Sequence, residues 1–141
     1  FDSRDIHRGA VPAKLFYGAS KDYYEFNSKV YKKVKNLIEL RKSLPCMSRG
    51  DFTLVKTASP ANFAYIRSFK DEKVLVINNL SPDKLIAEIT IPMEVVLKSE
   101  GKKIDNFKNL VNGDDVKVNV SLKNRTMHLR IAPYGVVWLK L

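Results

Sequence analysis

The sequence has little of what disulfide, metal and membrane chemistry require. Cys46 is the only cysteine among 141 residues, so the chain cannot form an internal disulfide or a multi-cysteine metal site. The two histidines, His7 and His128, are too few and too far apart in sequence to indicate zinc binding, so we expect no metal and no cofactor. The longest apolar runs fall far below the roughly 18 residues of a membrane-spanning helix. We therefore expect a soluble protein without membrane contact.

Neither the start of the chain nor its thiol points to secretion. The first residue is Phe1 and not Met, so we expect a chain that was cut or processed. The charged and apolar regions of a signal peptide do not follow it. A single free thiol, at Cys46, fits a reducing compartment and slightly favours the cytoplasm.

The composition is that of one modest globular domain, or of a domain with an appendage. Apolar residues make up 45% of the chain and aromatic residues 10%, which is enough for a core. The formal net charge of +10 makes a nucleic-acid-binding domain one hypothesis. However, the excess is mostly lysine scattered along the chain, without an Arg-rich block or an RNP-type aromatic motif. A solvated, lysine-rich surface is the simpler interpretation.

Residues 1–26 predict a long loop, since Gly9, Pro12 and Gly18 interrupt them and no periodicity is sustained. Such a loop is uncommon inside a compact domain and more often has a function or packs on another element. Its densest polar cluster is Arg4, Asp5, His7 and Arg8, whereas the aromatic residues Tyr23, Tyr24 and Phe26 indicate anchoring contacts.

An amphipathic helix follows, beginning at Asn27 or Ser28 and ending at Pro45. Asp22, with Glu25 three residues later, offers an alternative and earlier start through a capping box. One face of the helix is apolar, with i, i+4, i+7, i+8 spacing: Val30, Val34, Leu37 and Ile38. Because an isolated helix of this length is marginal in water, we expect this stripe to fold back on the rest of the chain or to self-associate.

After Gly50 the apolar period changes to two, which predicts short strands separated by turns. The run Val74–Ile77 is apolar on both faces, as in a central strand. The other strands alternate, with apolar positions at Phe63, Tyr65 and Phe69, at Leu85, Ala87, Ile89 and Ile91, at Val116, Val118, Val120 and Leu122, at Met127, Leu129 and Ile131, and within 136–141. Turns are expected at 70–73, 81–83 and 123–125. The predicted fold class is mainly β: an antiparallel β-sandwich of Greek-key type with about six to eight strands, preceded by a loop and one amphipathic helix.

This order of elements resembles the end of α-amylase-superfamily glycosidases such as α-glucosidases, trehalose synthases and α-amylases. Their last barrel helix reads "LI-x-LRK", then "PAL" and "G"; the matching residues here are Leu37, Ile38, Leu40, Arg41, Lys42, Pro45 and Gly50. The segment FAYIRSFKDEKVLVINNLS (63–81) resembles the hairpin of the following domain, with Arg67 and Asn78 at its characteristic polar positions. Pro133 and Tyr134 resemble the start of the final strand.

The resemblance implies that residues 1–50 are a loop and helix from the end of a (β/α)₈ barrel, and that residues 51–141 are the C-terminal all-β domain. It further implies a non-catalytic domain that stabilises the barrel of a parent enzyme acting on α-glucosides, by hydrolysis or by transglycosylation. The family needs two carboxylates, a nucleophilic Asp on "G-x-R-x-D" and a Glu acid, and also an "N-H-D" segment. Asp2-Ser3-Arg4-Asp5 is only superficially similar, and no Asn-His-Asp occurs. We therefore expect no catalytic residues here, leave the substrate-binding residues open, and expect no glycosidase activity from this chain alone.

A carbohydrate-binding module, with an α-glucan or an oligosaccharide as its partner, is the main alternative. It requires two or more exposed aromatic residues on one sheet face, and the sequence offers Trp138 and either Tyr65 or Tyr134. We expect Trp138 to pack against another element, His128 and Arg130 to lie on an exposed strand face, and Cys46 to be a structural thiol. Within the parent enzyme, Arg4, Asp5, His7 and Arg8 would lie near the barrel's active site, where a solvated loop is favoured over sugar contacts.

Overall fold

The computed structural model describes residues 21–92, 106–121 and 123–141, and side chains from Ser28 onward. The chain divides into two compact units, residues 1–38 and 39–141, which are described separately. The predicted polar cluster of Arg4, Asp5, His7 and Arg8 lies outside the described residues, as do the side chains of Tyr23, Tyr24 and Phe26.

Helix α3 spans Lys21–Ser43. The predicted start at Asn27 or Ser28 was therefore several residues too late, and the expectation of a loop is wrong for residues 21–26. The helix includes Asp22 and Glu25, the pair that marked the alternative start, and neither glycine nor proline occurs between Ala19 and Leu44 to interrupt it. On its apolar face Val30, Val34 and Ile38 are 44%, 49% and 48% exposed.

Pro45 ends the first helix and begins a second one. Leu44 is extended, with φ −110° and ψ 101°, as expected for a residue before proline. The short helix α4, Pro45–Arg49, was not predicted, although proline at the first helical position has no donor to lose and a suitable φ. Its residues Cys46 and Met47 are buried.

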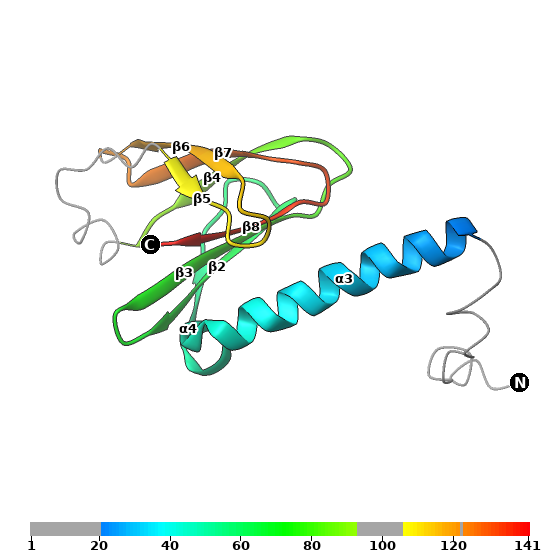
Figure 1. Ribbon diagram of the computed structural model, residues 1–141. Helices are drawn as coiled ribbons and strands as arrows, with labels where there is room; N and C mark the ends of the chain where they lie inside the picture. The colour runs from blue at the N-terminus through cyan, green and yellow to red at the C-terminus, as the bar shows by residue number, and fades with distance from the viewer. Residues whose placement is uncertain (1–20, 93–105, 122) are drawn as a thin grey trace, which may run out of the picture. The chain divides into compact units, whose positions relative to one another are not determined.

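Within the described residues, eight strands form two antiparallel sheets of four strands each, which confirms the predicted mainly β class. Figure 1 shows the two layers. Sheet A has the order β1-β2-β3-β8, and sheet B has the order β4-β7-β6-β5. The strands of sheet A are β1 (Asp51–Val55), β2 (Asn62–Phe69), β3 (Glu72–Asn79) and β8 (Val136–Lys140). The strands of sheet B are β4 (Leu85–Thr90), β5 (Asn106–Lys108), β6 (Asp115–Ser121) and β7 (Thr126–Ile131). Sheet B is a Greek key, since β5, β6 and β7 follow one another and β4 lies beside β7.

The core lies between the two sheets and is built from every second residue of each strand. Sheet A contributes Val55, Ala64, Ile66, Leu75, Ile77, Val137 and Leu139; sheet B contributes Ala87, Ile89, Val118, Met127, Leu129 and Ile131. The run Val74–Ile77 is fully buried in β3 between β2 and β8, so the predicted central strand is confirmed. In β2 the core residues are Ala64 and Ile66, and the more prominent aromatic positions of that strand face outward.

Bridges close both sides of the sandwich. After β1 the chain crosses to sheet B, where Thr57 pairs with Ile89. On the other side Asn109 pairs with Leu139, and its side chain accepts a hydrogen bond from the backbone N–H of Trp138 at 3.0 Å. These bridges use backbone groups that edge strands would otherwise leave open to other chains.

Candidate functional site

The outer face of β1 and β2 carries a cluster of apolar side chains, which we call the aromatic face: Phe52, Leu54, Phe63 and Tyr65. The rings of Phe52 and Tyr65 stack at a centroid distance of 4.9 Å and an angle of 29°. Phe63 lies on the other side of Tyr65, at 5.6 Å and 50°. Leu54, Phe52 and Phe63 are 64%, 53% and 41% exposed.

Strand register places these residues together. Leu54 pairs with Tyr65, and Phe52 pairs with Arg67, so alternate residues of β1 and β2 share one side of sheet A. Thr53 and Val55 point the other way, toward the core layer. The sequence analysis found no strand at β1 and therefore missed Phe52 and Leu54 as members of a surface.

One apolar row crosses the whole width of sheet A on this outer side. It runs Leu54, Tyr65, Val76 and Trp138 through directly paired residues. Exposure falls along this row, from 64% at Leu54 to 1% at Val76 and 8% at Trp138. Trp138 therefore does not present an open ring, and the uncovered end of the row lies at β1.

Helix α4 packs on the same side of sheet A, against β2 and β3. Arg67 Nε donates to the Cys46 carbonyl at 3.2 Å, and Glu72 Oε1 accepts from the Cys46 backbone N–H at 2.8 Å. The backbone N–H and the backbone carbonyl of Cys46 are thus both held by side chains of the β2–β3 hairpin. Gly50 then allows a close turn into β1, since a Cβ there would meet the Cys46 carbonyl oxygen at 2.4 Å.

These contacts give Cys46 an unreactive environment. Its side chain is fully buried, and burial, together with the neighbouring Glu72 carboxylate, raises the pKa of the thiol to about 12. The hydrogen bond from the Cys46 backbone N–H lowers the pKa of Glu72. The arrangement stabilises a carboxylate and suppresses a thiolate, which is opposite to what a nucleophilic cysteine requires.

Two polar side chains beside the aromatic face, Arg67 and Asn78, are hydrogen-bonded to backbone carbonyls of α4 and β2. Arg67 holds α4, and Asn78 Nδ2 donates to the Phe63 carbonyl at 3.3 Å. The neighbouring Asn79, which the sequence analysis did not single out, is the more deeply buried of the two asparagines, at 2% exposure. Its amide donates to the carbonyls of Asp83 and Ala132 and its oxygen accepts from the Ser81 N–H, so it ties β3 to two loops.

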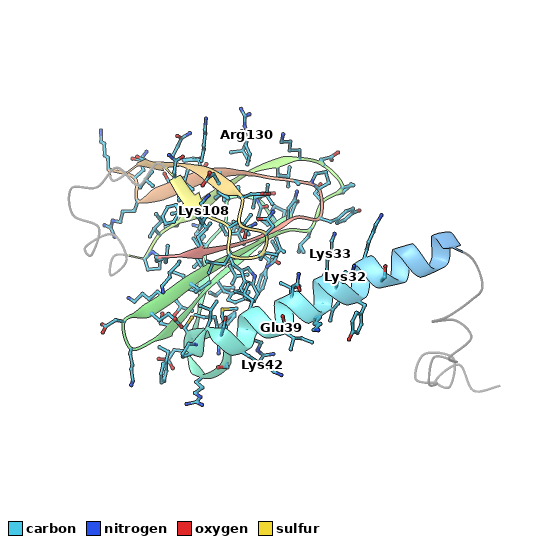
Figure 2. All side chains as sticks on the ribbon, in the orientation of Figure 1. Lys32, Lys33, Glu39, Lys42, Lys108 and Arg130 are labelled. Carbon is cyan, nitrogen blue, oxygen red and sulfur yellow. The ribbon has the colours of Figure 1, made fainter. Side chains whose placement is uncertain are left out.

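The outer face of sheet B is polar. His128 and Glu88 are cross-strand partners, with Nδ1 and Oε2 3.9 Å apart, and Arg130 is exposed beside them. Figure 2 shows Arg130 and Lys108 on this sheet, and Lys32, Lys33 and Lys42 distributed along α3. The labelled basic side chains thus come from several different elements.

A shallow hollow of about 470 Å³ lies at one end of the sandwich, between β1, β4 and the turn before β7. Lys56, Lys123 and Arg125 line it, and all three are exposed. Exposed basic side chains attract anions only weakly in water, since solvent screens them. Among the described residues no group of three or more His, Cys, Asp or Glu side chains is placed to hold a metal ion. Nor is any described helix both long and apolar enough to cross a membrane.

Comparison with known proteins gives clear relatives. The chain is 31% identical over 143 residues to an oligo-1,6-glucosidase of Bacillus cereus, an alignment that covers 96% of this chain and 23% of that protein. It is 33% identical over 60 residues to a palatinase of Erwinia rhapontici, covering 43% of this chain and 11% of the palatinase. The chain thus spans about a quarter of the length of the oligo-1,6-glucosidase and about a tenth of the length of the palatinase. No protein-family model matches it.

Solved structures share its fold. A noncanonic maltogenic α-amylase from Thermotoga neapolitana superposes with a TM-score of 0.61 at 15% identity, over 94% of this chain and 27% of the amylase. An Anoxybacillus α-amylase gives a TM-score of 0.57 at 18% identity, over 89% of this chain and 23% of its own. A debranching enzyme from Nostoc punctiforme gives 0.57 at 15% identity, over 82% and 20%. The chain is thus a homologue of the oligo-1,6-glucosidase and the palatinase, matching one part of those larger proteins, and it shares the fold of part of α-amylase-family enzymes.

Proposed function

We propose that the chain is the C-terminal, non-catalytic part of an α-amylase-family glycoside hydrolase or transglycosylase acting on α-glucosides, and that its β-sandwich stabilises the catalytic (β/α)₈ barrel. The observation that carries this proposal is the extent of the oligo-1,6-glucosidase alignment: 96% of this chain but only 23% of the relative. A segment that is homologous throughout, yet spans a quarter of an enzyme, fits a supporting domain better than a complete catalyst.

Two parts of the chain suit two parts of such an enzyme, with a boundary at Gly50 that differs from the division between the compact units at Ile38 and Glu39. In this proposal residues 1–50 are the end of the barrel and α3 is its last helix, whereas residues 51–141 are the separate β domain. The exposed apolar stripe of α3 at Val30, Val34 and Ile38 supports this assignment. A helix of a barrel buries such a stripe against its neighbours, and without them it stays open to water.

The direct test compares the whole gene product with the 141-residue chain. We expect the sequence upstream of Phe1 to encode alternating strands and helices with an Asp–Glu–Asp set, and the whole product to cleave or transfer an α-glucoside such as isomaltose or maltose. The purified chain should show no turnover above buffer. Turnover by the chain itself, or an upstream region unrelated to this family, would overturn the proposal.

A carbohydrate-binding module is the second candidate, because the aromatic face supplies the exposed rings that such a module requires. Calorimetric titration of the chain with maltooligosaccharides separates the two functions. Binding in the millimolar range or tighter, lost in Phe52→Ala, favours the module, and no measurable heat favours the supporting domain. A basic nucleic-acid-binding domain predicts steeply salt-dependent retention of DNA or RNA, which a gel shift tests.

A further inference from the structure

We propose that the aromatic face, formed by Phe52, Leu54, Phe63 and Tyr65, is the surface through which the sandwich docks on the catalytic part of the same enzyme. This inference rests on the proposed function and deepens it, because it names one of the two sheet faces and the side chains that make the contact.

The two outer faces of the sandwich differ in the apolar side chains that they expose. Single exposed apolar side chains are ordinary on a protein surface, whereas contiguous ones mark an interaction site. On sheet A three large apolar side chains, Phe52, Leu54 and Phe63, are exposed within two adjacent strands. On the described strands of sheet B the only comparable residue is Ile86, whose cross-strand partner is Arg130.

The preceding chain attaches to the sandwich on the side that carries the aromatic face. Residues 44–50 lie on the outer side of sheet A, since Cys46 is bonded to Arg67 and Glu72 of the β2–β3 hairpin. Whatever precedes them in the enzyme is therefore tethered beside the aromatic face by only a few residues. A tether this short gives an intramolecular partner a high effective concentration at that face.

The side chains of the aromatic face and their neighbours favour a protein partner over a sugar. A sugar site needs polar groups that converge beside the rings and fix the hydroxyls. Here Arg67 is bonded to the Cys46 carbonyl of α4, and Asn78 is bonded to the Phe63 carbonyl of β2. Phe52 and Tyr65 also stack on each other, so each ring has one face already occupied. A surface made mostly of apolar side chains, with its neighbours Arg67 and Asn78 already hydrogen-bonded, fits an apolar protein surface better than an oligosaccharide.

Leu54 and Ile86 provide a matched pair for the test. They are 64% and 63% exposed, and each lies on an end strand of its sheet, facing outward. Leu54→Asp and Ile86→Asp are each introduced into the whole gene product and into the 141-residue chain. In the whole enzyme Leu54→Asp should shorten the half-life of α-glucosidase activity at a fixed elevated temperature about tenfold or more, because a charge then replaces a buried contact. Ile86→Asp should leave it within about twofold.

The 141-residue chain shows whether the effect belongs to docking. There both variants should keep the urea midpoint of the unmodified chain, because both side chains are exposed. An equal loss of stability from Leu54→Asp in the chain alone would mean that Leu54 supports the sandwich itself, and would overturn the proposal. So would an active enzyme whose half-life is the same in both variants, or maltooligosaccharide binding by the chain that Phe52→Ala removes. A whole gene product without glycosidase activity would instead refute the proposed function.

Discussion

Gly50 connects α4 to β1, and its replacement by alanine should destabilise the sandwich. Its backbone is ordinary, with φ −75° and ψ 164°, so the need for glycine is steric and not conformational. An added Cβ would lie 2.4 Å from the Cys46 carbonyl oxygen and 2.6 Å from that of Ser68. Carbon and oxygen atoms need about 1 Å more than this, and both obstacles are backbone atoms, so α4 and β2 must move apart.

The cost can be worked from what this movement disturbs. Overpacking a tight site costs about 1–3 kcal/mol. The same movement strains two hydrogen bonds at the Cys46 carbonyl, from Gly50 N–H at 3.0 Å and from Arg67 Nε at 3.2 Å, each worth about 1 kcal/mol. We expect Gly50→Ala to lower the free energy of unfolding by about 2–3 kcal/mol.

Urea unfolding followed by fluorescence measures this loss, since Trp138 is the only tryptophan and lies buried in β8. The midpoint should fall by roughly 1 M. Gly113 is the control, because it has φ +79° and no atom within 4 Å of the position that an added Cβ would take. Gly113→Ala should cost only about 1 kcal/mol, and Gly113→Asn less, because asparagine tolerates a positive φ. A loss below about 0.5 kcal/mol for Gly50→Ala would refute the steric argument.

Three further predictions concern Asn79, Cys46 and Glu72. Asn79→Ala should cost about 2–4 kcal/mol, because three hydrogen bonds are lost, whereas Asn78→Ala should cost under about 1 kcal/mol; equal urea midpoints would contradict this. Cys46 in the folded chain should react with a disulfide reagent at pH 8 roughly a thousandfold more slowly than free cysteine, and fast labelling would show that its burial and raised pKa are wrong. Glu72 has a pKa below its usual 4.5, so its carboxylate stabilises the fold above that pH, and the stabilisation is lost as the pH falls through the lowered pKa. Glu72→Gln should therefore flatten the pH dependence of unfolding between about pH 5 and 3, and an unchanged slope would count against the Cys46–Glu72 bond.

The helix and the central strand were predictable because several signals agreed on each. Pro45 marked a boundary, and it also begins α4, since proline suits a first helical turn. The four apolar residues Val74–Ile77 required a strand covered on both sides, and β3 is that strand. The helix start was misjudged because the aromatic residues just before Asn27 were taken as loop anchors, although nothing in residues 21–26 opposes a helix.

The candidate site was harder to predict for a geometrical reason. A period of two shows which residues of a strand share a face, but not which of the two faces meets the core. In β2 the larger apolar residues, Phe63 and Tyr65, point outward, and the smaller Ala64 fills the core position. In β1 both alternating sets include apolar residues, and the strand is only five residues long. Register with β2 brings these outward residues together, and register is not readable from one sequence.

The number of packing layers that each sheet needs shows how much of the sandwich still has to be covered by a partner. β1, β2, β3 and β8 carry apolar residues on both faces, so sheet A needs a layer on each side, whereas the polar outer face of sheet B needs only one. Sheet B supplies the first layer of sheet A. Within residues 39–141, α4 supplies part of the second, on β2 and β3. The row from Trp138 at 8% exposure to Leu54 at 64% shows where the second layer ends, so the length of apolar row still exposed measures how much further covering surface the partner must provide.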